Sequence, residues 1–277
     1  MTRPIVLCTD YGLHDEFVGT CHGVIARIAP DARVIDLTHA IPRQDVVRGA
    51  IVLSRATPFM PADAVYCAVV DPGVGSERRA IAVRSASGAL LVGPDNGVLS
   101  PAWTELGGAI AAFEITASAV VLDPVSNTFH GRDVFTPAAA HLANGVQLDT
   151  VGPPLDLEAL RVLELAGPMV APGAIGARVV RVDGFGNVQL NVTEGHLRAA
   201  GFGEHVHMGG AALPFVSIFA DLPDHGLGVI VDSQGYVALV VNNGSAAEAL
   251  NVHEGSAIVL EAGDDGAMGP RHLQPVD

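Results

Sequence analysis

Four polar side chains in the first hundred residues each come directly after a short apolar run. Asp10 follows IVLCT, His39 follows VIDLT, Asp71 follows VYCAVV and Asp95 follows LLVGP. Ligands of open α/β sheets bind outside the carboxyl ends of the strands, so these positions indicate a site by placement alone. Carboxylates and an imidazole there are suited to acid–base chemistry or to holding hydroxyl groups.

The stretch DPGVGSER, residues 71–78, is the most informative of these positions. Two glycines and a proline after a buried strand predict a tight turn that fixes the Asp71 carboxylate and returns Arg78 toward it. The ordinary alternative is a connection closed by a surface ion pair, and the motif alone leaves both open. Its G-x-G has no third glycine and no helix pattern after it, which argues against a dinucleotide fingerprint.

A second motif, TFHGRDV at residues 128–134, places His130 beside a glycine at the entrance to a predicted helix, 134–144. Gly131 leaves room for a ligand near the backbone, and a helix N-terminus offers unpaired N–H donors. A histidine with a purely structural role is the alternative.

The segment DYGLHD, residues 10–15, alternates Asp and His at short spacing and so invites a metal interpretation. Hard cations need several oxygen ligands around one point, and the chain has no second cluster of comparable density. A carboxylate at the end of a first strand can instead accept two hydrogen bonds from a ribose diol. We prefer the ribose interpretation for Asp10 and expect no metal.

Composition excludes several classes of protein. All 15 residues of the Lys+Arg total are arginine, and the absence of lysine rules out Schiff-base chemistry and P-loop ATPases. A net charge of −15 disfavours binding to nucleic acid, whose affinity for proteins comes from Lys and Arg. Three cysteines without C-x-x-C spacing argue against a disulfide framework or a structural zinc site. With no signal peptide and no apolar run of membrane-spanning length, we expect a cytoplasmic protein that has no membrane partner.

The order of apolar segments predicts two domains. Strands at 5–9, 34–37 and 65–70 alternate with helices at 17–28 and 46–55, as in βα units on a mostly parallel sheet. Prolines and small residues in AGPMVAPGA place a linker at 167–174, between an α/β domain over 1–166 and a domain over 175–277. The second domain alternates β runs with glycine-containing turns and predicts a smaller all-β barrel or sandwich.

Turns of the second domain also carry polar residues. DGFGN at 183–187 and DSQG at 232–235 are explained by ordinary β-turn chemistry. Phe185, expected to be exposed at a turn tip, could stack on a planar base.

Seven ordered motifs together resemble the S-adenosyl-L-methionine (SAM) hydroxide adenosyltransferases, the SAM hydrolases related to the fluorinases. The motifs, which run in order over nearly the whole chain, are TDYGLHDEFVG (9–19), VVDPGVGSERR (69–79), GPDNGVLS (93–100), TFHGRDVF (128–135), VDGFGNVQLN (182–191), DSQG (232–235) and VNNGSAA (241–247). The resemblance implies hydrolysis of SAM to adenosine and methionine without a cofactor. It also implies a homotrimer in which SAM lies between one subunit's N-terminal domain and its neighbour's C-terminal domain.

The resemblance also implies roles for individual residues. Asp71, Arg78 and His130 match a catalytic triad that positions and activates water, and Asp10 matches the carboxylate that holds the ribose hydroxyls. Further substrate-binding residues implied in the first domain are Gln44, Asp95, Asn96 and Phe129. Those implied in the second are Asp183 and Ser233 at the methionine end and Phe185, Asn187, Phe219, Val241 and Asn243 at the adenine end. Gln234 departs from the pattern, because the fluorinases have an arginine there toward the methionine carboxylate.

Halogenation is the nearest alternative reaction, because it would use the same SAM pocket. Relative to the fluorinases, this chain has Gly131 in place of a serine and Asp71 in place of a tyrosine, and it lacks a loop inserted between Arg84 and Ala89. Loss of a hydroxyl donor and gain of a carboxylate both disfavour halide binding, so hydrolysis is expected. A protein that binds SAM or adenosine without turnover is the alternative from another class.

Overall fold

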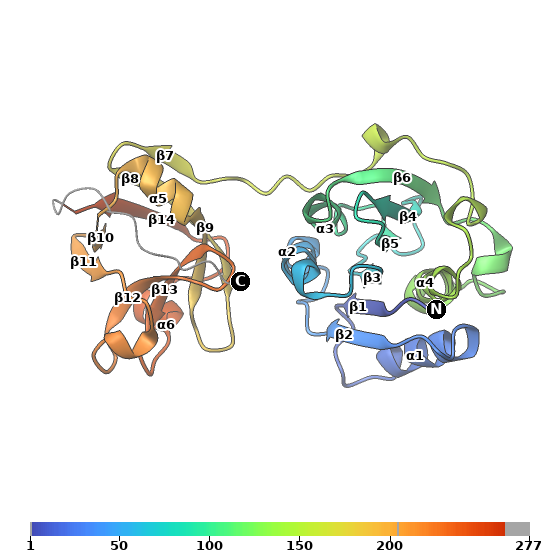
Figure 1. The fold of residues 1–277 in the computed structure, drawn as a ribbon. Coiled ribbons are helices and arrows are strands. Elements are labelled where there is room, and N and C mark those ends of the chain that lie inside the picture. Colours follow the sequence, from blue (N-terminus) through green and yellow to red (C-terminus); the bar gives the residue numbers. More distant parts are fainter. Residues whose placement is uncertain (1, 204, 264–277) are drawn as a thin grey trace. The chain divides into compact units, whose positions relative to one another are not determined.

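The computed structural model describes residues 2–203 and 205–263. The chain divides into two compact units, Met1–Glu164 and Leu165–Asp277 (Figure 1). The expected linker at 167–174 is partly occupied by strand β7 (Met169–Ala171), which pairs antiparallel with β8 (Ala174–Val182). The Pro-Gly pair there makes the turn of a hairpin, because Gly173 has a φ of 75° that a glycine adopts without strain.

The first unit contains a six-stranded mixed sheet. Four neighbouring strands are parallel, whereas β4 runs antiparallel to both of its neighbours. A short turn joins β4 to β5, and a connection of that length can only make an antiparallel pair. The expected mostly parallel sheet is therefore confirmed, and β4 is its one reversed strand. In sheet order the strands are β2 (Val34–Thr38), β1 (Ile5–Thr9), β3 (Val65–Val69), β5 (Leu90–Pro94), β4 (Ala80–Ser85) and β6 (Ala109–Glu114).

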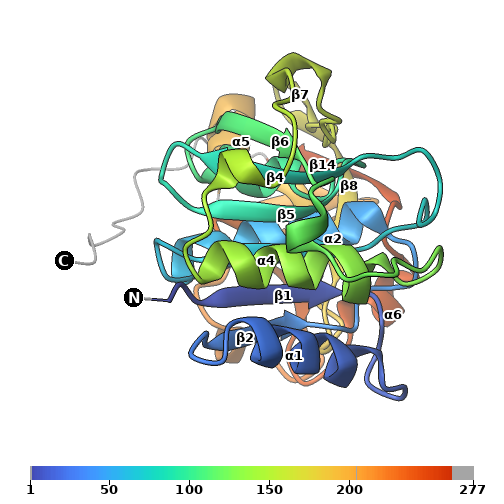
Figure 2. The same cartoon turned by 90° about the vertical axis from the view of Figure 1, so that its right-hand side faces the viewer.

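Helices cover both faces of this sheet (Figure 1). One face packs on α1 (Phe17–Ile28) and α4 (Thr136–Ala143), which lie in front of the strands in Figure 2. The other packs on α2 (Val46–Ala56) and α3 (Ser100–Glu105). Alternate residues of β1 enter the two cores, with Ile5 on one side and Val6 on the other. Strands covered on both faces are predominantly apolar, and every residue of β1 and β3 is buried.

The helix expected over 134–144 begins differently in the structure. A π-helical turn, Gly131–Phe135, precedes α4, and Thr136 Oγ1 donates to the Gly131 carbonyl at 2.8 Å. Pro137 has no N–H to offer Asp133, whose carbonyl accepts instead from the Leu122 N–H at 2.8 Å. The remaining short helices of this unit are Thr57–Phe59, Ser118–Val120, Leu148–Thr150 and Leu157–Ala159.

The second unit is an antiparallel sheet that nearly closes into a barrel. The residue after β11, Phe215, forms a bridge to Val229 of β12, so that the two ends of the sheet approach one another. The expected β domain is confirmed in this coarse form. Its strands, in sheet order with β7 beside β8, are β11 (Ala211–Pro214), β10 (His205–Met208), β14 (Ala257–Ala262), β8, β9 (Val188–Thr193), β13 (Tyr236–Val241) and β12 (Leu227–Val231); the helices are α5 (Glu194–Ala200), η6 (Phe219–Asp221) and α6 (Ala246–Leu250).

No helix within the described residues is both long and apolar enough to cross a membrane. Cys8, Cys21 and Cys67 are buried free thiols in the first unit. Burial raises the pKa of Cys8 and of Cys21 to about 12, so both remain protonated and unreactive near neutral pH.

Candidate functional site

Asp71, Arg78 and His130 form one hydrogen-bonded cluster. Asp71 lies two residues after the end of β3. Arg78 Nε lies 3.0 Å from both of its carboxylate oxygens, and Arg78 Nη2 lies 2.5 Å from Oδ2. The same Nη2 lies 2.7 Å from Nδ1 of His130, at the entrance to the π-helical turn. The Asp71 and Arg78 side chains are only 6% and 11% exposed. The motif alone left open a surface ion pair between Asp71 and Arg78. In the structure this ion pair is nearly buried, and His130 is its third partner.

The contact with Arg78 determines how the His130 ring is protonated. A guanidinium only donates hydrogen bonds, so Nδ1 of His130 must accept, and the proton of the neutral ring resides on Nε2. Burial, together with the charge of Arg78, lowers the pKa of His130. The ring is therefore neutral at pH 7 and presents Nε2–H as a donor.

Glycines let the 71–78 turn pack closely on the segment before His130. Gly75 has a φ of 76°, and a Cβ there would lie 2.3 Å from the Asn127 carbonyl oxygen. Because backbone occupies that space, a side chain at this position would separate the turn from the His130 segment. The distance between Arg78 and His130 thus depends on this glycine.

Asp10 lies at the end of β1, the neighbour of β3. Its Oδ2 accepts a hydrogen bond from the Gln44 backbone N–H at 2.8 Å. Gln44 makes this contact with a positive φ of 64°. Burial raises the pKa of Asp10, and the charge of Asp71 adds to that effect, so the two carboxylates share one electrostatic environment. The adjacent strand ends therefore bring Asp10 to the cluster, as the sequence predicted.

Aromatic rings form a wall beside His130. Tyr11, Phe17 and Phe129 meet edge to face, with ring centroids 5.1 to 6.0 Å apart. A Cβ on Gly131 would lie 1.9 Å from the Tyr11 Oη. The space beside Gly131 is thus filled by the Tyr11 hydroxyl, so this glycine accommodates a neighbouring side chain of the same chain.

Asp95 and Asn96 have their polar groups engaged within the chain. Asp95 accepts from Arg79 Nε at 2.9 Å and from the Arg161 N–H at 2.8 Å. Asn96 donates to the Val70 carbonyl at 2.8 Å, directly before Asp71. These contacts give both residues a structural role, and their assignment to substrate binding stays a prediction.

The second unit contains a cavity of about 460 Å³. Four of its lining residues were expected from the sequence: Asp183, Asn187, Phe219 and Ser233. Asp183 organises its own turn, because Oδ1 accepts from the N–H groups of Phe185 and Asn187 at 2.9 and 3.0 Å.

Three residues expected in the binding site are not among those that line this cavity. Phe185 is 83% exposed at its turn, as expected. Val241 is buried in the core of the second unit. Asn243 has a φ of 56° and donates to Asp224 Oδ1 at 3.0 Å. Their proposed role at the adenine end remains a prediction.

The cavity also contains a residue that sequence reasoning missed. Arg181, from β8, lines it, and the buried Nε of Arg181 has no hydrogen-bond partner. A buried guanidinium nitrogen without a partner is costly, which indicates a site for an anionic ligand group. Gln234 stands where the fluorinases have an arginine. This departure is the sequence feature that points to another residue as the source of the positive charge.

The metal interpretation that the DYGLHD segment invites would need Asp10, His14 and Asp15 as ligands, and among the described residues these three do not form a cluster of potential metal ligands. His14 and Asp15 are exposed, whereas Asp10 is directed to Gln44. His39, the remaining polar strand ending, contacts Asp36 and not the Asp71 cluster.

Comparisons with known proteins identify the family of this chain. Residues 5–152 match the model of the SAM hydroxide adenosyltransferase N-terminal domain, and residues 177–259 match that of the C-terminal domain. A protein from Salinispora arenicola named (R)-S-adenosyl-L-methionine hydrolase is 49% identical over 94% of this chain and 98% of its own length. A fluorinase from Nocardia brasiliensis is 28% identical over 94% of this chain and 98% of its own. The crystal structure of an uncharacterized conserved protein from Thermotoga maritima has a TM-score of 0.85 and 35% identity, covering 92% of this chain and 99% of that one. The chain belongs to the SAM hydroxide adenosyltransferase family.

Proposed function

We propose that this protein hydrolyses SAM to adenosine and methionine, by attack of water on the ribose C5′ carbon. The observation that carries the proposal is the nearly buried Asp71–Arg78–His130 cluster at the carboxyl edge of the sheet, beside Asp10. The family relationship supports the same substrate.

The chemistry explains why such a cluster is needed. The sulfonium leaves as a neutral thioether and needs no general acid, so the difficult partner is water, whose pKa is about 15.7. Attack forms the C5′–O bond, breaks the C5′–S bond with its electron pair moving to sulfur, and releases one proton. Groups that orient the water and take its proton supply the catalysis.

The tautomer of His130 divides the work between the three residues. His130 Nδ1 is already occupied by Arg78, so Nε2–H is the remaining donor of a ring that also hydrogen-bonds the Ser126 backbone. When this N–H donates to the water oxygen, it stabilises the negative charge that develops there. Asp71 accepts the proton, and Arg78 orients its carboxylate through hydrogen bonds to both oxygens. The sequence left either Asp71 or His130 as the base, and this geometry favours Asp71.

The two ends of the substrate need different partners. Asp10, partly desolvated, is suited to accept hydrogen bonds from the two ribose hydroxyls. The methionine end carries an ammonium and a carboxylate, for which Asp183 and Arg181 in the second unit's cavity offer opposite charges. Arg181 thus replaces the arginine that the chain lacks at position 234.

We further propose that active sites form between neighbouring subunits of a homotrimer, with Phe185, Asn187 and Phe219 around the adenine. The family resemblance supports this assembly. Light scattering should give the mass of three chains in solution, and a monomer that retains full activity would contradict it.

The reaction is tested by incubating the purified protein with SAM and following adenosine by chromatography. In ¹⁸O-labelled water the adenosine should carry the label at the 5′ hydroxyl. Chelator treatment should leave the rate unchanged, because no reacting group needs a metal. Formation of 5′-halogenated adenosine in fluoride or chloride would favour the halogenase alternative, and SAM binding without turnover would favour a binding protein.

Activity should fall as the pH is lowered through a value below 6.5, the ordinary pKa of histidine, because the pKa of His130 is lowered by burial. Below that pKa the ring gains a proton on Nδ1 and loses its hydrogen bond from Arg78. This loss should appear as an acidic limb in the pH profile of kcat. In His130→Gln the limb should vanish, whereas His141→Gln, which removes another histidine with a burial-lowered pKa, should retain it. A limb that persists unchanged in His130→Gln would contradict the assignment.

Replacing Arg181 with glutamine should raise KM for SAM by about 10- to 100-fold, as expected for one charge-assisted hydrogen bond, with a smaller effect on kcat. Arg178→Gln is the matched control, because Arg178 lies on the same strand with an exposed side chain. Steady-state kinetics of both variants measure the difference. An unchanged KM in Arg181→Gln would remove this residue from the methionine end.

A further inference from the structure

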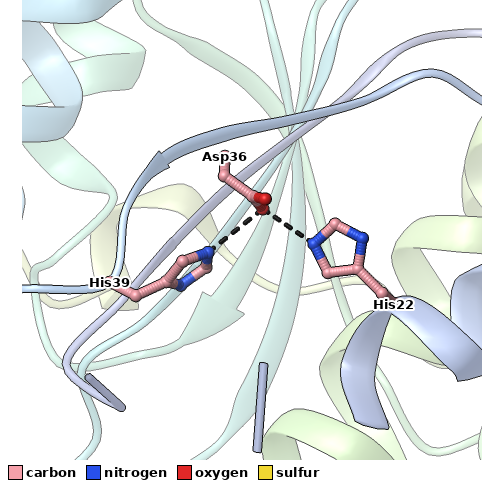
Figure 3. Close-up of side chains that lie close together, drawn as sticks. All are labelled: His22, Asp36 and His39. Carbon is pink, nitrogen blue, oxygen red and sulfur yellow. Dashed lines mark hydrogen bonds and ion pairs between the residues drawn. The ribbon is translucent and has the colours of Figure 1, made fainter. Parts of the chain in front are cut away.

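Two histidines and an aspartate form a second polar cluster in the first unit. Nε2 of His22, from α1, lies 2.9 Å from Oδ1 of Asp36 on β2, and Nε2 of His39 lies 3.0 Å from the same oxygen. Figure 3 shows both imidazole rings directed at this carboxylate from opposite sides. The three ligand atoms all lie within 4.8 Å of one another. None of these residues belongs to the proposed hydrolytic machinery.

His39 is held in the way that a metal-ligating histidine is held. Its side chain is only 3% exposed, and its Nδ1 lies 2.8 Å from the Thr9 hydroxyl. Its carbonyl accepts from the Gly12 N–H at 2.7 Å, which fixes the backbone as well. Histidine ligands commonly engage their second ring nitrogen in such a contact, which sets the tautomer and orientation of the ring.

The other ring nitrogen of His39 has no hydrogen bond. Nε2 is buried, and its contact with Asp36 meets an ion-pair distance without the geometry of a hydrogen bond. When Nδ1–H donates to Thr9, the Nε2 lone pair is directed at a carboxylate, which is repulsive unless a cation lies between them. In that tautomer the buried Nε2 lone pair is available to bind a cation beside the Asp36 carboxylate.

The donor set selects the class of cation. Two imidazole nitrogens and one carboxylate oxygen suit zinc and similar divalent transition metals, whereas calcium and magnesium prefer oxygen ligands alone. Zinc bonds of about 2.0–2.2 Å in a tetrahedron separate ligand atoms by about 3.3 Å. The two contacts with Asp36, at 2.9 and 3.0 Å, would therefore open by a few tenths of an ångström, and the two imidazole nitrogens, now within 4.8 Å of one another, would take up the same separation. His22 and Asp36 are 36% and 43% exposed, which leaves the fourth position open to water.

We propose that His22, Asp36 and His39 bind one divalent transition-metal ion of the zinc class. The ion would join α1 and β2 to the segment after β1, because His39 contacts Thr9 and Gly12 on either side of Asp10. Its role is to stabilise this part of the fold. The hydrolytic step proposed above needs no metal and does not pass through it.

The test uses the full chain, freed of metal by a chelator and dialysis. Titration with ZnCl2 in a calorimeter should show one tight site per chain, and the melting temperature should rise with added zinc. CoCl2 serves as a spectroscopic probe, because four-coordinate cobalt(II) absorbs visibly. His22→Ala and Asp36→Asn should each weaken zinc binding by more than about 100-fold, since loss of an outer-shell partner alone costs about 10- to 100-fold.

Two further variants distinguish zinc binding at this cluster from nonspecific zinc binding to other histidines. Thr9→Val keeps the shape of the side chain but removes the hydroxyl beside His39, and should weaken zinc binding by about 10- to 100-fold. His141→Ala, which changes a histidine of α4 that is not part of the cluster, should bind zinc as the unmodified chain does. Far-ultraviolet circular dichroism confirms that each variant is folded. Absence of a saturable zinc site, or unchanged affinity in both His22→Ala and Asp36→Asn, would overturn the proposal.

Discussion

Replacing Asp71 with asparagine should lower kcat for SAM hydrolysis by about 10²- to 10⁴-fold, the range expected for a positioned acid–base group. Asparagine keeps the size of the side chain, but it can neither take the proton of water nor form an ion pair with the Arg78 guanidinium. In the unmodified protein, Arg78 donates three hydrogen bonds to the Asp71 carboxylate. KM should change less, because Asp71 acts on the nucleophile. Single-turnover measurement of adenosine formation checks the chemical step directly.

The proper control is an aspartate of the same unit that is exposed and outside the cluster. Asp149→Asn meets this requirement and should retain its rate. Because Asp71 and Arg78 act as one unit, Asp71→Asn combined with Arg78→Gln should be scarcely slower than the slower single variant. Losses that multiply would instead show that the two residues act independently and would contradict the proposed division of roles.

Replacing Gly131 with alanine should lower the rate by about 10²-fold and destabilise the protein by about 1–3 kcal/mol. The added Cβ would lie 1.9 Å from the Tyr11 hydroxyl oxygen, so the Tyr11 ring must move, and the aromatic wall beside His130 moves with it. Thermal unfolding and kcat measure the two effects.

A second substitution tests whether the clash with Tyr11 is the cause. Removing the hydroxyl with Tyr11→Phe relieves the shortest contact, although ring carbons would still lie 2.9 and 3.1 Å from the new Cβ. Tyr11→Phe combined with Gly131→Ala should therefore recover part of the stability lost by Gly131→Ala alone. Failure to recover any stability would show that Gly131 is needed for another reason.

The same geometry bears on the halogenase alternative. The fluorinases carry a serine at the position of Gly131, so Gly131→Ser is the obvious substitution for introducing a halide donor. Here the hydroxyl of Tyr11 occupies the space that the new side chain would need. We expect Gly131→Ser to lose hydrolysis without forming halogenated product, because the Asp71 carboxylate also remains to repel a halide.

Local sequence patterns determined many of the individual elements and the chemical groups at their ends. The strand at 5–9 and the helix at 17–28 follow from a buried apolar run and a helical period, and both appear with those bounds. Asp71 and Arg78 are seven residues apart in one glycine-containing turn, so their pairing could be anticipated from turn chemistry alone. Four of the cavity residues in the second unit also sit in recognisable motifs.

Only the tertiary structure decided how distant segments meet. His130 lies 52 residues beyond Arg78, and nothing local shows that the guanidinium occupies its Nδ1 and leaves Nε2–H as the donor. The sequence gives Arg181 the appearance of an ordinary strand residue. Only the structure shows that it lines a cavity and that its buried Nε has no hydrogen-bond partner. The contact of His22 with Asp36 likewise requires α1 to pack beside an edge strand. The physical reason is that periodicity and turn geometry are set by neighbours in the chain, whereas burial, protonation and ligand geometry depend on groups brought together by packing.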